Sequence, residues 1–188
     1  MEGKKPIICA AVAVGPYDVI GQNGVMPWHC RSDLYHFQKI TTPHPCIFGR
    51  TTFENLPHVP LPNRFNIVCS AQYKNIYQNG VFYADSIESA LQECSGCSKV
   101  FICGGAQIYR YAFDNDLVDI LYLTQIKDAM LAENVRKNPD LYCHFYPGVS
   151  AFFNSPKWQM EKIIYSKNEL PTNTGNTSAE FFKFNRTR

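Results

Sequence analysis

A chain of 188 residues, of which 45% are hydrophobic and 18% are charged, can bury its own core without disulfide or metal cross-links. A formal net charge of +2 gives no electrostatic reason to expect nucleic acid as a partner. The polar start leads into an apolar segment too short for a membrane span or a signal peptide, and no heptad is apparent. We therefore expect one domain over residues 1–188, a monomer in the cytoplasm that does not bind membranes.

The eight cysteines are interpreted as reduced, mostly buried small hydrophobic residues, because disulfides are rare in the cytoplasm. Cys94 and Cys97 have a spacing found in zinc sites, and Cys143 with His144 could complete such a site. The usual second pair of closely spaced ligands is missing. We predict no metal centre.

The first elements along the chain point to a buried acid. The continuous apolar run 7–14 predicts a strand buried on both faces, and the Gly- and Pro-containing loop 15–28 is expected to form a lid. Ser32 is a good N-cap for a helix that opens at Asp33, with Leu34 and Phe37 on the same side as the acid. The carboxylate should therefore point inward, where it needs hydrogen-bond donors from the protein or from a ligand.

Strands and helices then alternate through the middle of the chain. The predicted strands and helices are strand 45–49, a helix from Arg50, strands 65–69 and 80–84, a helix capped by Asp85-Ser86 and running through Cys94, strand 99–103 and helix 106–113. This order predicts an α/β fold with a central, mostly parallel twisted sheet flanked by helices. Strands 119–126, 158–165 and 179–185 follow, the last two separated by a polar loop, so that an antiparallel hairpin ends the sheet; region 127–147 cannot be assigned.

Two strand-to-helix turns contain glycine, at Gly49-Arg50-Thr51-Thr52 and at Gly104-Gly105-Ala106-Gln107. Backbone N–H groups at a helix start attract anions, and Arg50 adds a cation, so the two turns together could clamp a pyrophosphate. Neither turn matches the dinucleotide fingerprint or the P-loop, and both fit ordinary tight turns equally well.

Several motifs, taken in order, resemble the dihydrofolate reductase family over nearly the whole chain. These motifs are Ala10-Ala11-Val12-Ala13, Val19-Ile20-Gly21, Met26-Pro27-Trp28, Asp33-Leu34 with Phe37, Gly49-Arg50-Thr51-Thr52-Phe53-Glu54, Pro60-Leu61-Pro62-Asn63-Arg64, Gly104-Gly105-Ala106-Gln107-Ile108-Tyr109 and Leu121-Tyr122-Leu123-Thr124. The resemblance implies the family's fold and NADPH-dependent reduction of 7,8-dihydrofolate to 5,6,7,8-tetrahydrofolate. This reaction supports one-carbon metabolism and thymidylate and purine synthesis, and antifolate inhibitors act on it.

In this family the acid that matches Asp33 binds the 2-amino group and the N3 side of the pterin. An Asp here is like the bacterial members, whereas vertebrate members have Glu. The resemblance implies that Asp33 promotes protonation at N5 through a water, while hydride passes from nicotinamide C4 to pterin C6. Trp28 and Thr124 would order that water and the carboxylate.

The resemblance also implies the binding residues. For the substrate these are Cys9, Ala11, Leu34, Phe37, Leu61, Arg64 and Cys103, with Ile102 as the alternative to Cys103. Arg64 would take the glutamate α-carboxylate with a two-pronged hydrogen bond. For NADPH they are Ala13, Ile20, Gly21, Met26, Gly49, Arg50, Thr51, Thr52, Ser70, Gly104, Gly105, Ala106, Gln107, Ile108 and Tyr109.

Some residues depart from the family pattern. His29-Cys30-Arg31 places a cation where many members have an apolar or Pro-containing segment. Asp85 is expected near the adenosine end, where its charge would disfavour a 2′-phosphate, so the preference for NADPH over NADH should depend mainly on Arg50. Cofactor placement near His144 does not follow from the sequence.

Two other functions fit this architecture. One is the reductase that acts on a ribosylamino-pyrimidine in riboflavin synthesis, which has no use for an acid beside a ring or for Arg64 at a glutamate tail. The other is a folate- or NADP-binding module without catalysis, against which Asp33, Trp28 and Thr124 argue. Turnover of dihydrofolate discriminates between all three.

Overall fold

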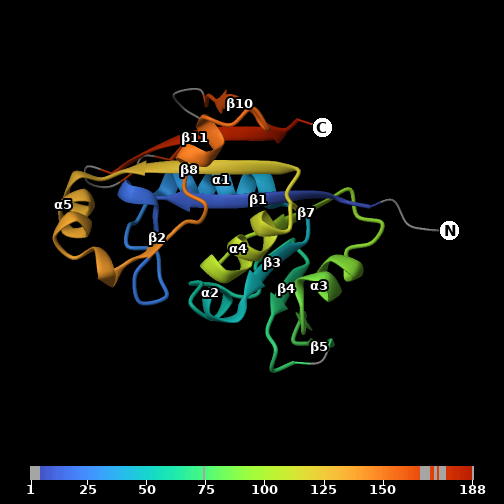
Figure 1. Cartoon of the computed structure of the whole chain (residues 1–188). Helices are drawn as coiled ribbons and strands as arrows, with labels where there is room; N and C mark the ends of the chain where they lie inside the picture. Colours follow the sequence, from blue (N-terminus) through green and yellow to red (C-terminus); the bar gives the residue numbers. More distant parts are fainter. Residues whose placement is uncertain (1–4, 74, 166–169, 172, 174–176, 188) are drawn as a thin grey trace. The chain divides into compact units, whose positions relative to one another are not determined.

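The structure, a computed structural model, describes residues 5–73, 75–165, 170–171, 173 and 177–187. The chain forms two compact units, whose elements are labelled in Figure 1. Unit 1 consists of Met1–Ala10 and Thr41–Asp119, and unit 2 of Ala11–Ile40 and Ile120–Arg188. The start of the polar N-terminal segment lies outside the described residues. The expectation of a single domain over residues 1–188 stays a prediction.

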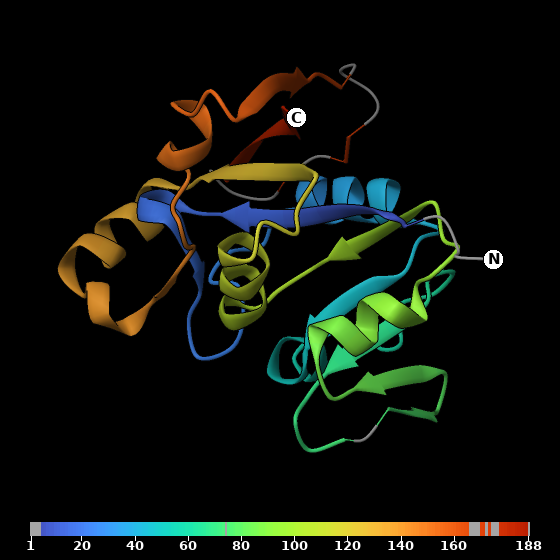
Figure 2. The same ribbon diagram turned by 45° about the vertical axis from the view of Figure 1, so that its right-hand side comes forward.

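Unit 1 is built on a mostly parallel sheet. In order across it, the strands are β1 (Ile7–Val14, whose first half belongs to this unit), β7 (Lys99–Ile102), β3 (Cys46–Gly49), β4 (Asn66–Cys69), β6 (Val81–Ala84) and β5 (Ile76–Gln78). Only β5 is antiparallel to its neighbour. The helices are α2 (Arg50–Glu54), α3 (Ile87–Glu93) and α4 (Ala106–Asp114), and α3 packs on β4 and β6 (Figure 2). Short, continuously apolar strands suit this buried parallel arrangement.

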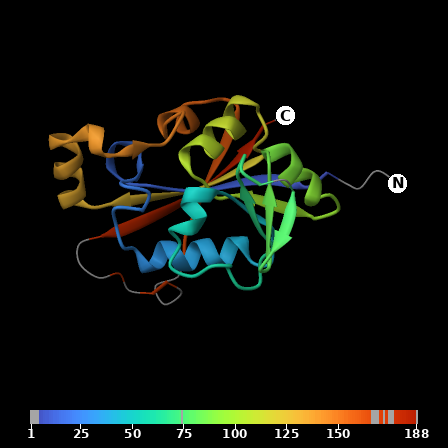
Figure 3. The ribbon, with the colours of Figure 1, turned by 90° about the horizontal axis from the view of Figure 1, so that it is seen from below.

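Unit 2 contains the antiparallel strands at the other end of the sheet order. These are β10 (Trp158–Ile163), β11 (Ser178–Arg186) and β8 (Ile120–Lys127), followed in order by β1. A two-stranded sheet pairs β2 (Val19–Gly21) with β9 (Cys143–His144). Helix α1 (Arg31–Thr41) runs along one face of the strands (Figure 3), and α5 (Ala129–Lys137) and α6 (Ser150–Phe153) complete the unit, with 3-10 turns at Pro16–Asp18 and Pro139–Leu141.

The predicted elements are confirmed, each with ends within two residues of the structure. The α/β class, the mostly parallel sheet and the final antiparallel hairpin are confirmed as well. Most of the polar loop predicted inside that hairpin lies outside the described residues. Five of the strands and α-helices in the described residues were not predicted: β5, α5, α6 and the paired strands β2 and β9, of which β2 lies within the expected loop 15–28.

Candidate active site

Asp33 is a buried acid in the first turn of α1, with a side chain that is 6% exposed. The buried Thr124 on β8 hydrogen-bonds to its carboxylate. Burial raises the pKa of Asp33 to about 6, and the bond from Thr124 opposes part of that rise. The predicted inward acid is confirmed. A charge held here is poorly solvated, so it favours a ligand that brings N–H donors.

The start of α1 differs from the prediction. The helix begins at Arg31, and the N–H of Leu34 donates to the carbonyl of Cys30 at 3.2 Å, which makes Cys30 the N-cap. Ser32 therefore lies inside the first turn and is not the N-cap. The prediction for the buried side of α1 is also wrong in part, because Leu34 is 43% exposed. Residues three apart share a face of a helix, and the residue buried together with Asp33 is His36.

Trp28 packs on a small core of Val19, Leu131 and Val135. A Cβ atom at Gly15 would lie 3.0 Å from the Trp28 ring, so glycine allows the close approach of loop and indole. Among the described residues, the buried indole Nε1 has no hydrogen-bond partner. A buried N–H of this kind is expected to meet a water or a ligand.

The expected lid, residues 15–28, is tied to the chain near residue 145. The N–H of Phe145 donates to the carbonyl of Asp18 at 2.7 Å, and the N–H of Val149 donates to the Asp18 carboxylate at 3.2 Å. The predicted cofactor residues in this loop are Ile20 and Gly21, both partly buried in β2, and the exposed Met26. The closing of this loop over the nicotinamide stays a prediction.

In unit 1, Arg64 lies in a loop that Asn66 holds in shape. The buried Asn66 side chain accepts from the N–H of Leu61 and donates to the carbonyls of Leu61 and Arg64, each at 2.9 Å. The Arg64 guanidinium donates through Nε to the Pro62 carbonyl at 3.1 Å and through Nη1 to the Thr41 hydroxyl at 3.2 Å. The sequence interpretation missed Asn66, although a polar residue at the start of an apolar strand is a signal for such a role.

The two glycine turns of unit 1 meet, and their role as a pyrophosphate clamp stays a prediction. The N–H of Gly49 donates to the carbonyl of Gly104 at 2.6 Å, and a Cβ at Gly105 would lie 2.7 Å from the Thr52 hydroxyl. Gly104 has φ +108, a conformation that favours glycine. The predicted residues Ala106, Gln107, Ile108 and Tyr109 form the first turn of α4. Backbone N–H groups at the start of a helix suit an anion.

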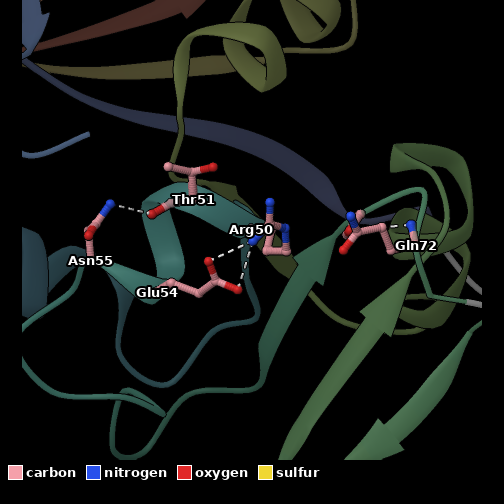
Figure 4. A network of polar contacts seen from close by, with 6 residues as sticks. Arg50, Thr51, Glu54, Asn55 and Gln72 are labelled. Carbon is pink, nitrogen blue, oxygen red and sulfur yellow. Dashed lines mark hydrogen bonds and ion pairs between the residues drawn. The ribbon is translucent and has the colours of Figure 1, made fainter. Parts of the chain in front are cut away.

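Arg50 lies at the start of α2 and is paired within its own helix. Its Nη1 donates to both carboxylate oxygens of Glu54, at 3.1 and 2.8 Å, and both side chains are about half exposed (Figure 4). In the same view, the Asn55 side chain donates to the Thr51 carbonyl. The hydroxyl of the predicted cofactor residue Ser70 accepts from the N–H of Gln72 at 3.4 Å. The cation expected to hold a phosphate is thus already neutralised by Glu54.

Cys9 and Cys103 are buried thiols in unit 1. Cys103 follows β7, and burial together with a hydrogen bond to Cys46 raises its pKa well above the ordinary value. The Cys103 thiol therefore stays protonated and acts as a small apolar group. Ala11 is buried and Ala13 is partly buried in the second half of β1.

The predicted site residues divide between the two units. Unit 1 holds Cys9, Leu61, Arg64, Cys103 and the residues of the two glycine turns with Ser70, and unit 2 holds Ala11, Ala13, Ile20, Gly21, Met26, Trp28, Asp33, Leu34, Phe37 and Thr124. Within unit 2, Asp33 and Thr124 are in contact, and within unit 1 the two glycine turns are. A single site composed of all of these residues stays a prediction.

Two features are absent from the described part of the chain. No group of three or more His, Cys, Asp or Glu side chains there is arranged to hold a metal ion. No helix among those residues has the length and apolar character needed to cross a membrane.

Comparisons with known proteins agree on one family. A family model described as dihydrofolate reductase matches residues 7–142. The dihydrofolate reductase of Candida albicans is 39% identical, with 85% of this chain and 86% of the relative covered, and that of Haemophilus influenzae is 34% identical, with 83% and 86% covered. The solved structure of dihydrofolate reductase from Enterococcus faecalis, complexed with NADP(H) and RAB-propyl, has a TM-score of 0.71 over 99% of both chains and 22% sequence identity, which shows the fold. With a match of this extent and relatives of this identity, the chain belongs to the dihydrofolate reductase family.

Proposed function

We propose that this protein reduces 7,8-dihydrofolate to 5,6,7,8-tetrahydrofolate with NADPH, and so supplies one-carbon metabolism in the cytoplasm. Family membership supports the reduction of dihydrofolate with a nicotinamide cofactor. The observation that carries the proposal is Asp33, a carboxyl group that burial keeps near the point of ionisation at neutral pH. Its ionised form would accept the 2-amino and N3 hydrogens of the pterin.

The proton that N5 needs would come through a water. Trp28 supports this step, because its buried Nε1 is without a partner among the described residues and would donate to that water. Thr124 would keep the Asp33 carboxylate oriented through its hydroxyl. Asp33 would then raise the proton affinity of N5 by holding the pterin and the water together, with a pKa suited to this role near neutral pH.

The residues of unit 1 fit a dinucleotide phosphate. Gly105 is the N-cap of α4, where backbone N–H groups suit an anion, and a Cβ there would lie 2.7 Å from the Thr52 hydroxyl, so glycine keeps the two turns close together. Gly49, Arg50, Thr51, Thr52 and the first turn of α4 would hold NADPH there. When bound, NADPH supplies the hydride. Arg64, preset by Pro62 and Thr41, would bind the α-carboxylate of the substrate's glutamate.

The test is oxidation of NADPH by the purified protein with dihydrofolate, followed by the loss of NADPH absorbance and repeated with NADH. We expect rapid turnover that depends on dihydrofolate, with a lower kcat/KM for NADH. Saturable binding of NADPH and dihydrofolate without turnover would replace the proposal by a binding module. Turnover of a ribosylamino-pyrimidine in place of dihydrofolate would replace it by the riboflavin-type reductase.

The Arg50–Glu54 pair predicts how cofactor selectivity is set. Replacing Glu54 by Gln should strengthen NADPH binding about twofold to threefold, because Arg50 then no longer has to leave the Glu54 carboxylate in order to bind a phosphate. The gain is small because an exposed ion pair contributes little free energy. Arg50→Gln should weaken NADPH binding about tenfold. Cofactor fluorescence titrations at low and high salt measure both effects, and NADH should respond less than NADPH.

Glu133→Gln is the matched control for the Glu54 variant. It breaks another i,i+4 pair of similar exposure, Glu133 with Lys137 on α5, and should leave NADPH affinity unchanged. An equal gain for NADH and NADPH in Glu54→Gln would mean that Arg50 does not read the 2′-phosphate. No gain for either cofactor would mean that Arg50 does not contact the phosphates.

A further inference from the structure

The helix that carries Asp33 has an N-cap residue whose side chain is a poor hydrogen-bond acceptor. The N-cap residue is Cys30, and a thiol is a weak acceptor for the unpaired N–H groups of a first turn. The N–H of Ser32 donates instead to Oδ1 of Asn173 at 3.0 Å. Asn173 lies 141 residues further along the chain, in the connection between β10 and β11.

The Asn173 amide matches this end of the helix with both of its polar atoms. Its Nδ2 donates to the Ser32 hydroxyl at 3.0 Å, while its Oδ1 also accepts a weak bond from the Cys30 thiol at 3.5 Å. Both Cys30 and Ser32 are buried. A buried first turn without such a partner would leave its N–H groups unsatisfied, which is costly.

The same connection holds α1 again one turn later. Tyr165, just after β10, hydrogen-bonds through its hydroxyl to Nδ1 of the buried His36 at 2.5 Å. Phe181 on β11 lies against the His36 ring, with centroids 4.5 Å apart, and is paired in register with Thr124 on β8. Asp33 therefore lies between two points at which the final hairpin contacts its helix.

We propose that Asn173 is a positioning residue for the reaction: it caps α1 in place of an N-cap side chain and so fixes the Asp33 carboxylate against Thr124. This inference rests on the proposed function. Asn173 acts through the helix and touches neither substrate nor cofactor. Fraying of the first turn would admit water around Asp33, whose raised pKa is due mainly to burial.

The test compares Asn173→Ala, Asn173→Asp and Thr177→Val with the wild type. Asn173→Ala should lower kcat about fivefold, on the scale of a lost helix cap, with the NADPH dissociation constant unchanged. The apparent pKa of its pH–rate profile should fall toward the ordinary value for Asp. Asn173→Asp keeps the acceptor for the Ser32 N–H and should restore both values. Thr177→Val removes a bond from the same connection to Asp128, away from α1, and should keep the wild-type profile.

Three results would contradict the positioning role of Asn173. An Asn173→Ala enzyme with the wild-type kcat and pH profile overturns it, as does a folded Asn173→Asp enzyme that is no better than Asn173→Ala. An equal shift in Thr177→Val also overturns it, because general loosening of the hairpin would then explain the effect. If Asn173→Ala does not fold, Asn173→Ser replaces it, since its hydroxyl is one bond too short to reach the Ser32 N–H. A wild type without turnover would instead refute the proposed function.

Discussion

Replacing Asp33 by Asn is expected to lower turnover of dihydrofolate about a hundredfold or more at pH 7, on the scale of a lost acid–base group. The amide cannot carry the charge that holds the protonated pterin, and it cannot raise the proton affinity of N5. NADPH affinity should stay the same, because the phosphate-binding residues proposed above lie in unit 1. Single-turnover NADPH oxidation and a cofactor titration on both proteins measure the two effects.

The same substitution should make the unliganded protein more stable at neutral pH. In the folded protein Asp33 keeps its proton up to a pH of about 6, whereas the ordinary value is 3.8. A raised acid pKa means that stability is present below the ordinary value and is lost as pH rises through about 6. At pH 7 the loss amounts to about 3 kcal/mol, which Asp33→Asn avoids. Urea unfolding at pH 7 should show the gain, and at pH 4 it should have mostly disappeared.

Asp85→Asn is the control of opposite sign. Hydrogen bonds from Ser89, Ser86 and Asn75 lower the pKa of this exposed acid, so its removal should reduce stability at neutral pH. If wild type and Asp33→Asn have equal free energies of unfolding across the pH range, burial does not destabilise the ionised form of Asp33. Full turnover by Asp33→Asn would remove Asp33 from the mechanism.

Local patterns predicted most elements and the burial of Asp33, and two missed elements carried signals of their own. Helix α5 has Asp128 as an N-cap that accepts from the N–H of Leu131, followed by Val135 one turn later. Strand β5 is joined to β6 through Asn79-Gly80, both with positive φ, which is a typical hairpin signal. Both signals lie in short or polar stretches, where periodicity is weak.

Contacts between distant segments did not follow from the sequence. The glycine turns after β3 and β7 meet because these strands are neighbours in the sheet, with Cys46 opposite Phe101, although many residues separate them in the chain. The hydrogen bond from the Ser32 N–H to Asn173 also joins distant segments. Ser is a residue type that favours the N-cap position, but α1 begins before Ser32, and the acceptor for its N–H comes from Asn173. Residue type indicates a capacity to hydrogen-bond, and only the fold chooses the partner.

Replacing Arg64 by Leu is expected to raise the KM for dihydrofolate about thirtyfold to a hundredfold, the range for losing a two-pronged bond to a carboxylate. The Pro62 carbonyl and the Thr41 hydroxyl hold the guanidinium in place before a ligand binds, so little ordering remains to be done on binding. The dissociation constant for NADPH should change little. Steady-state kinetics and a fluorescence titration with folate measure these effects.

A substrate without the glutamate tail isolates the contact. A dihydropterin that lacks the tail should be reduced equally well by wild type and Arg64→Leu, because the partner of the guanidinium is missing in both cases. Arg64→Lys keeps the charge but not the fork and should fall between the two proteins. Thr41→Val removes one holding bond and should cost much less than Arg64→Leu. If Arg64→Leu impairs the tailless substrate as strongly as dihydrofolate, Arg64 supports the shape of its loop with Asn66 and does not bind the carboxylate.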